Sequence, residues 1–349
     1  MNSAAEPQSG DGVLRWLAAQ KVMLASPPVR LTGGASSRVY FRVRLASGQT
    51  RVVMSLPAGP RISDEIGAAE PDTAELPFVQ IGRWLRARDV PVPTLDVVDA
   101  AQGYLMMEDL GDRRLYDALQ GDTAAAQVVR YGEALDLLHR FQAGVGSENP
   151  GKNVLSAAAI AAEFEEFVTA GIEHRQGLEL TEDERAVTAA AACQLTLELA
   201  AAPQALAHRD FQSQNIMCTA RGLVLIDYQD CFLAPFAYDL VALLRDSYVV
   251  LDPADVDTLV HQFFDESAAA QASMGGIGDF QRLFHVQTVQ RKLKDAGRFV
   301  TLAGKGKPEF LRYYPDSIRY AMHALRQLED EPAYADLAQL LSARVPEAA

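Results

Sequence analysis

The feature that most constrains the fold is a change of hydrophobic period near residues 108–112. Before this point, apolar residues alternate over 39–45 and form a short run at 52–54, patterns typical of the two strands of a hairpin. After it, apolar residues recur every three or four positions over long alanine-rich stretches, as in amphipathic helices. The sequence therefore predicts an α+β protein with a small antiparallel β lobe followed by a larger, mainly helical lobe.

The length of 349 residues is about that of two ordinary domains. We expect a flexible tail over residues 1–12, an N-terminal nucleotide-binding lobe over 13–110 and a C-terminal catalytic and substrate-binding lobe over 111–349. Within the first lobe, helical periodicity predicts helices over 13–24 and 77–87.

Charge and composition exclude several function classes. The 32 Lys and Arg against 46 Asp and Glu leave a formal net charge of −14, which disfavours general binding to nucleic acid or to anionic membranes. The three cysteines match neither a disulfide framework nor zinc-ligand spacing. We find no apolar run long enough to span a bilayer and no secretory signal, so we expect a cytoplasmic protein.

The strongest chemical pattern is His-Arg-Asp at 208–210, followed by Asn215 and, after an apolar run, by Asp227. In phosphoryl transfer, one carboxylate accepts the proton of the attacking hydroxyl, while an amide oxygen and a second carboxylate hold the magnesium that neutralises the phosphates. Asp210, Asn215 and Asp227 suit these three roles in that order. The alternative is that the first two cap a loop and that Asp227 ends a strand.

A glycine-rich bend precedes the first strand pair and contains Gly33, Gly34 and Ser36. Small residues allow backbone N–H groups to approach phosphate oxygens, so the bend is a candidate nucleotide loop. A plain hairpin turn is the alternative, and the downstream acidic residues favour the nucleotide loop.

A kinase needs a cation for the nucleotide phosphates, commonly a lysine on the third strand, but the chain has no lysine between Lys21 and Lys152. Met54 occupies the corresponding strand position. Arg38 and Arg42 are four residues apart on a strand and so face the same side, which makes them our candidates for phosphate neutralisation. Ordinary exposed strand arginines remain the alternative.

These motifs resemble the aminoglycoside-phosphotransferase-like branch of the kinase fold, and within it the cell-wall sugar kinases that phosphorylate the anomeric hydroxyl of N-acetylmuramate and N-acetylglucosamine. The similarity extends over nearly the whole chain and is carried by GGASSRVYFRV, RVVM, GYLMMEDLGD, HRDFQSQNIM, LIDYQD, APFAYDLVALLRDSYV and QRKLKDAGRF. The resemblance implies a bilobal protein-kinase-like fold, ATP and Mg²⁺ as cofactors, an amino-sugar substrate and a place in peptidoglycan recycling. It also makes a methionine at position 54 an expected feature.

The resemblance further implies roles for residues outside the central motif. The segment from Met107 to Leu110 would be the hinge against adenine, with hydrogen bonds from backbone groups of Glu108 and Leu110. Asp239 resembles a structural aspartate of this branch, and we expect it to cap the helix that begins at Leu240.

Substrate selection has a candidate on a late helix, where Arg291, Lys294 and Arg298 share one face and could bind the lactyl carboxylate of N-acetylmuramate. Solvated ion pairs are the alternative for these three residues. The acidic stretch 161–185 suggests another acceptor class, an aminoglycoside, although a solvated surface explains it too. Choline- or homoserine-type kinases and a nucleotide-binding pseudokinase module are further alternatives.

Overall fold

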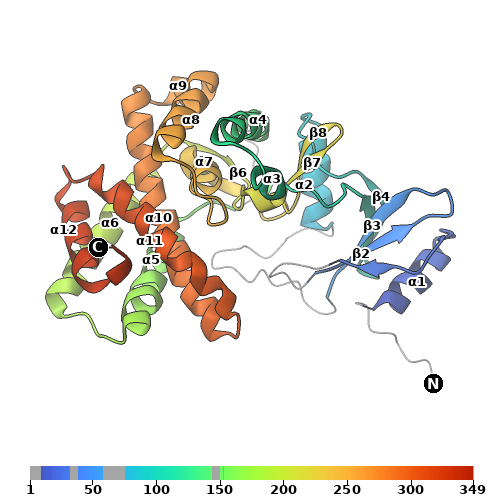
Figure 1. Cartoon of the computed structure of the whole chain (residues 1–349), viewed down its shortest axis with the longest axis horizontal. Helices are drawn as coiled ribbons and strands as arrows, with labels where there is room; N and C mark the ends of the chain where they lie inside the picture. Colours follow the sequence, from blue (N-terminus) through green and yellow to red (C-terminus); the bar gives the residue numbers. More distant parts are fainter. Residues whose placement is uncertain (1–8, 32–37, 58–74, 144–149, 152, 349) are drawn as a thin grey trace. The chain divides into compact units, whose positions relative to one another are not determined.

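The computed structural model describes residues 9–31, 38–57, 75–143, 150–151 and 153–348 (Figure 1). The chain forms two compact units. Of the described residues, the first unit contains 9–31, 38–57, 75–113 and 217–229, and the second contains the remainder.

The first unit is built on a five-stranded antiparallel sheet of order β1-β2-β3-β5-β4. Its strands are β1 (Val29–Arg30), β2 (Val39–Arg44), β3 (Thr50–Ser55), β4 (Leu95–Asp99) and β5 (Tyr104–Glu108), and its helices are α1 (Gly10–Ala19) and α2 (Pro77–Arg86). The hairpin of β7 (Ile216–Thr219) and β8 (Gly222–Leu225) returns to this unit late in the chain.

Strand register separates the two faces of this sheet. Tyr40 lies opposite Met54, and Arg42 lies opposite Val52, so these side chains share one face. The other face carries a buried apolar cluster that joins the sheet to α1: Val13, Trp16, Leu17, Phe41, Val43, Val53, Tyr104 and Met106. Because α1 covers one face, the predicted nucleotide residues Met54 and Arg42 project from the opposite one.

Helix α1 differs from the predicted helix over 13–24 at both ends. It begins after Ser9, whose hydroxyl accepts the N–H of Gly12 at 3.1 Å as an N-cap. It ends before Lys21, which has a left-handed φ of 59°, and Leu24 then pairs with Leu45 at the sheet. The prediction was wrong because Val22 and Leu24 pack against the sheet cluster from the segment after the helix.

The second unit is mainly helical. Its α-helices are α3 (Leu115–Leu119), α4 (Ala124–Gln142), α5 (Ala157–Glu166), α6 (Glu182–Ala201), α7 (Ala237–Leu244), α8 (Pro253–Glu266), α9 (Ala268–Ser273), α10 (Ile277–Gly304), α11 (Tyr314–Arg326) and α12 (Pro332–Arg344). A π-helix, η1 (Phe167–His174), continues α5, and the short 3-10 helices are η2 (Ser213–Asn215), η3 (Pro308–Tyr313) and η4 (Pro346–Ala348). The strands β6 (Gln204–Ala207) and β9 (Phe232–Pro235) pair antiparallel.

Helix α10 is the packing centre of the second unit and contacts α5, η1, α7 and α11. Its close crossing with η1 requires a glycine, because a Cβ at Gly297 would lie 2.8 Å from the Cα of Phe167. This crossing fixes the rotation of α10, and with it the direction in which Arg291 and Lys294 point. Among the described residues, no helix is both long and apolar enough to cross a membrane.

Candidate active site

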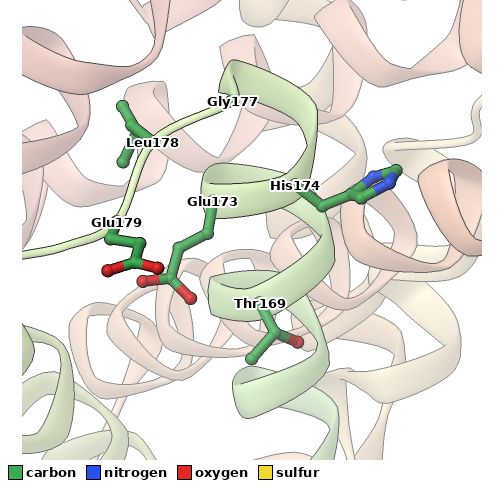
Figure 2. Close-up of a pocket in the computed structure, with 6 residues that line it drawn as sticks. All are labelled: Thr169, Glu173, His174, Gly177, Leu178 and Glu179. Carbon is green, nitrogen blue, oxygen red and sulfur yellow. The ribbon is translucent and has the colours of Figure 1, made fainter.

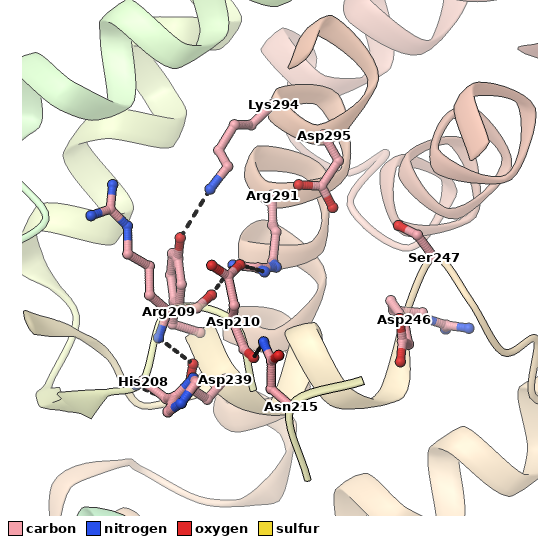
Figure 3. Close-up of polar contacts among 12 residues, drawn as sticks. His208, Arg209, Asp210, Asn215, Asp239, Asp246, Ser247, Arg291, Lys294 and Asp295 are labelled. Atoms are coloured by element: carbon pink, nitrogen blue, oxygen red, sulfur yellow. Dashed lines mark hydrogen bonds and ion pairs between the residues drawn. The ribbon is translucent and has the colours of Figure 1, made fainter. Parts of the chain in front are cut away.

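The loop that carries Asp210 follows β6 and is held from below by a buried aspartate (Figure 3). The carboxylate of Asp239 is fully buried and accepts the backbone N–H of His208 at 2.5 Å and of Arg209 at 3.1 Å. Arg209 has a left-handed φ of 86°, a costly conformation for a residue with a side chain. The two hydrogen bonds compensate for that cost and fix the backbone immediately before Asp210.

The expected capping role of Asp239 is therefore wrong. Asp239 lies inside α7, whose first residue is Ala237. Its carboxylate accepts hydrogen bonds from the loop after β6 and does not cap the helix. Burial raises the pKa of Asp239 to about 6, while nearby His208 and the loop N–H groups act in the opposite direction.

Asp210 and Asn215, predicted as catalytic base and metal ligand, are brought together by the short η2 turn. The Asn215 side-chain Nδ2 donates to the backbone carbonyl of Asp210 at 2.9 Å. The turn itself is held by Asp246, a fully buried carboxylate that accepts the N–H of Ser213 at 2.9 Å and its hydroxyl at 2.5 Å. With Nδ2 engaged, the amide oxygen of Asn215 is the atom suited to a cation.

Arg291 on α10 contacts this loop directly. Its Nη1 donates to the carbonyl of Arg209 at 2.8 Å, and its Nη2 donates to Asp210 Oδ1 at 3.3 Å. The arginine side chain is 1% exposed, whereas that of Asp210 is 45% exposed. Partial burial would raise the pKa of Asp210, but the charges of Arg291 and Lys294 outweigh burial and hold this pKa below the usual aspartate value.

Lys294 lies one helical turn further along α10 and is also engaged. Its Nζ donates to the hydroxyl of Tyr238 at 3.2 Å and lies 3.8 Å from Glu163 Oε1. Glu163 is itself buried and accepts a hydrogen bond from Gln290 at 2.6 Å. The structure thus places two of the predicted substrate cations, Arg291 and Lys294, in one polar network beside Asp210, and contact with a substrate stays a prediction.

Asp227 belongs to the first unit, where it pairs with one of the two candidate strand arginines. Arg38 Nη1 donates to Asp227 Oδ1 at 3.0 Å, and Gln229 Nε2 donates to the same oxygen at 3.0 Å. Asp227 has a left-handed φ of 63°, which turns the chain sharply after β8. Both described hydrogen bonds of the Asp227 carboxylate engage its Oδ1.

Arg42 lies on β2, whereas Arg38 immediately precedes this strand, and the two side chains have different environments. Its guanidinium makes four hydrogen bonds of 2.8–3.0 Å, two to Asp109 and two to Asp112. Burial would raise the pKa of Asp109, but the hydrogen bonds from Arg42 and from the N–H of Gly111 lower it. Arg42 thereby ties β2 to the segment that follows β5.

The predicted hinge lies at the end of β5. Met54 and Met107 are 1% and 5% exposed and belong to adjacent strands, and Leu110 is half-buried. The Glu108 N–H donates to the carbonyl of Thr94 at 2.9 Å, and its carboxylate accepts from Arg221 at 2.8 Å. The candidate loop residues Gly33, Gly34 and Ser36 lie outside the described residues.

Two buried carboxylates that the sequence analysis did not single out as site residues bind the Asp210 loop or a side chain near it. One is Asp246, which holds Ser213, and the other is Glu163, which pairs with Lys294. Asp246 stands near the end of the strongly apolar stretch 236–244, and a carboxylate there is a signal for a buried partner. Within the described ranges, we find no group of three or more His, Cys, Asp or Glu side chains that could together hold a metal.

A pocket on the second unit lies elsewhere, at the end of η1 (Figure 2). It is lined by Thr169, Glu173, His174, Gly177, Leu178 and Glu179. Glu173 is already paired with Arg185 at 2.6 Å and accepts the N–H of Leu180 at 2.9 Å. The pocket contains none of the predicted site residues.

The antiparallel five-stranded unit, the helical unit and the loop from Asp210 to Asn215 define a class: kinases with the aminoglycoside-phosphotransferase-like fold. A choline/ethanolamine kinase family protein from Mesorhizobium loti matches with a TM-score of 0.57 and 15% identity over 96% of this chain and 98% of that one. An ADP-bound aminoglycoside phosphotransferase matches with a TM-score of 0.56 and 12% identity over 90% of this chain and 99% of that one. These likenesses confirm the predicted fold.

The chain belongs to the phosphotransferase enzyme family, whose model matches residues 27–274. An N-acetylmuramate/N-acetylglucosamine kinase from Pseudomonas putida is 28% identical, covering 88% of this chain and 85% of the relative. A protein of the same name from Neisseria meningitidis is 29% identical, covering 88% of each chain. The protein is thus an ATP-dependent kinase that phosphorylates a hydroxyl group of a small molecule.

Proposed function

We propose that the protein transfers the γ-phosphoryl group of ATP to the anomeric hydroxyl of N-acetylmuramate, N-acetylglucosamine or both, in the recycling of peptidoglycan sugars. The observation that carries this proposal is the similarity to kinases of both sugars over 85–89% of their own length. Such coverage includes the α10 segment with Arg291 and Lys294, which lies beyond the 27–274 region of the family model.

In the proposed reaction, Asp210 accepts the proton of the sugar O1 as that oxygen attacks the γ-phosphorus. The new oxygen–phosphorus bond forms while the bond from the γ-phosphorus to the bridging oxygen breaks, and ADP leaves with the electron pair. Arg291 positions Asp210 by binding its carboxylate and the preceding carbonyl. The anomeric hydroxyl is more acidic than other sugar hydroxyls, so a carboxylate of low pKa is a sufficient base.

We propose Asn215 and Asp227 as the ligands of Mg²⁺. Both offer hard oxygen donors, which Mg²⁺ prefers. The described hydrogen bonds engage Nδ2 of Asn215 and Oδ1 of Asp227, so the remaining side-chain oxygen of each residue would bind the ion. When bound, Mg²⁺ neutralises charge on the nucleotide phosphates.

For ATP itself, we propose the glycine-rich bend at Gly33, Gly34 and Ser36 for the phosphates and the segment from Met107 to Leu110 for adenine. Met107 is buried in β5 and would supply apolar surface against the base. The backbone of Glu108 and Leu110 would provide the hydrogen bonds.

On the acceptor side, we propose that Lys294 contacts the sugar. We propose that Arg291 acts only indirectly, by positioning Asp210, because its Nη1 and Nη2 donate to the loop that carries Asp210. The contacts of the acidic stretch 161–185 weigh against a polyamine acceptor. Several of its carboxylates are neutralised or bonded within the second unit: Glu163 with Lys294, Glu166 with Thr301, Glu173 with Arg185 and Glu184 with Arg344.

The test is ADP release from ATP and Mg²⁺ with N-acetylmuramate, N-acetylglucosamine, an aminoglycoside and choline, with phosphorus NMR locating the new ester. We expect turnover of one or both amino sugars with the ester on O1, and none with Asp210→Asn as the matched control. Preferred turnover of the aminoglycoside or choline, or an ester at another hydroxyl, would contradict the proposed substrate. No turnover of any acceptor would favour a nucleotide-binding module.

A further inference from the structure

We propose that Arg38 is the cation that binds the nucleotide phosphates in this kinase, in place of a lysine on β3, and that Arg42 is a structural residue. The inference deepens the proposed function only on the nucleotide side and does not depend on which acceptor is used. It is argued from contacts within the first unit alone.

The strand register identifies the position that Arg38 takes over. Met54 on β3 has no charge to offer, and directly opposite it on β2 is Tyr40. The Tyr40 side chain is hydrogen-bonded to Arg38, and burial raises the pKa of Tyr40, so its phenol stays neutral beside the guanidinium. Arg38 is thus anchored to the strand position next to Met54 and extends from there to Asp227.

The contact with Asp227 indicates where the guanidinium can act. Arg38 Nη1 lies 3.0 Å from Oδ1 of the carboxylate that we propose as a metal ligand. A metal–nucleotide complex bound by that carboxylate would bring phosphate oxygens within reach of the same guanidinium, which can grip them in bidentate fashion. The pair is also easy to exchange, because its side chains are 21% and 43% exposed and such ion pairs contribute little to stability.

Arg42 is excluded from this role by its own partners. Four hydrogen bonds to Asp109 and Asp112 occupy most of the five N–H donors of a guanidinium. Two carboxylates also neutralise its charge, and one of them, Asp109, is only 6% exposed. Moving Arg42 to a phosphate would leave that carboxylate buried and unpaired, which is costly.

The test is the affinity for ATP and for adenosine, measured by titration calorimetry with Mg²⁺ on the full chain. Arg38→Met should weaken ATP binding about 10- to 100-fold, as expected for loss of charge-assisted hydrogen bonds, and leave adenosine binding unchanged. The double variant Arg38→Met/Met54→Lys should recover most of the ATP affinity, because it restores a cation on β3. Arg44→Met, which replaces an exposed arginine on β2, is the matched control.

The proposal is overturned if Arg38→Met binds ATP as the wild type does, or if it loses adenosine affinity to the same extent as ATP affinity. An equal loss would mean that Arg38 maintains the fold of the first unit. A larger loss of ATP affinity in Arg42→Met than in Arg38→Met would reverse the assigned roles. Because no acceptor is present in these titrations, a wrong acceptor assignment would leave their outcome unaffected.

Discussion

Asp210 and Asp227 are both proposed to act in phosphoryl transfer, and they differ in the cation that each one meets. Their side chains are almost equally exposed, at 45% and 43%. The arginine that binds Asp210, Arg291, is 1% exposed, whereas the arginine that binds Asp227, Arg38, is 21% exposed. The two carboxylates are thus equally exposed, but the arginine bound to Asp210 is buried and the arginine bound to Asp227 is partly exposed.

The exposure of each arginine determines whether its ion pair with the aspartate is permanent or can be exchanged for a contact with another anion. A buried guanidinium that loses its carboxylate becomes a buried charge without its counter-ion, a change that costs several kcal/mol. A partly exposed guanidinium can exchange a carboxylate for another anion at little cost. We infer that Arg291 keeps Asp210 ionised until it accepts the proton and oriented throughout turnover, while Arg38 changes partner when the nucleotide binds.

The largest effect is expected for Asp210→Asn, which removes the proton acceptor while keeping the shape of the side chain. We expect kcat to fall about 100- to 10,000-fold. Affinity for ATP should change little, because Asp210 belongs to the acceptor side. Steady-state kinetics and nucleotide titration would measure the two effects, and near-wild-type turnover would mean that another group is the base.

The next largest effect is expected for Arg291→Gln, which removes the ion pair between the buried Arg291 and Asp210. We expect a loss of about 2–3 kcal/mol in the free energy of unfolding, below the 3–5 kcal/mol typical of fully buried pairs because Asp210 is 45% exposed. Denaturant unfolding would measure it.

Arg298→Gln provides the matched control for Arg291→Gln. Arg298 lies two turns along the same helix and makes no hydrogen bond or ion pair with the described part of the chain. The conservative variant Arg291→Lys should recover part of both stability and kcat. Equal stability of Arg291→Gln and Arg298→Gln would contradict the inference that the ion pair of Arg291 with Asp210 is permanent.

A third effect depends on pH and concerns the carboxylate beneath the Asp210 loop. Burial raises the pKa of Asp239 to about 6 in the native state, above its unfolded value of 3.8, so the native state binds this proton more tightly. The resulting stabilisation is present at low pH and lost as pH rises through about 6. Between pH 7.5 and pH 5, the wild type should gain on the order of 1 kcal/mol relative to Asp239→Asn.

Unfolding free energies of both proteins at the two pH values would test this prediction. Taking the difference between wild type and variant removes the contribution of Asp246, whose pKa is also raised by burial. A difference that is independent of pH would show that Asp239 is ionised over the whole range.

The smallest effect is expected for Tyr228→Phe, beside the exchangeable pair. The Tyr228 ring is fully buried and stacks on Phe78, and its hydroxyl has no hydrogen-bond partner among the described residues. We expect a gain of up to about 1 kcal/mol in stability, since a buried polar group without a partner is removed. Thermal unfolding would show it, and a loss of stability would indicate that the hydroxyl binds water.

The sequence by itself determined the fold class and the order of its parts. Alternating strands before residue 108 and helical periods after 114 are local signals, because they depend on which face of each element is apolar. The motif from His208 to Asn215 was equally readable, since its residues are held by one short turn. These features need no knowledge of distant contacts.

Only the tertiary structure decided what each charged side chain touches. Arg291 meets Asp210 across 81 residues, Arg38 meets Asp227 across 189, and Asp239 meets the loop at His208 across 31. Periodicity predicts which face of an element a residue occupies but not what packs there. Hence Arg38 and Arg42 were equivalent in the sequence, and they became different because one faces Asp227 while the other faces the acidic residues after β5.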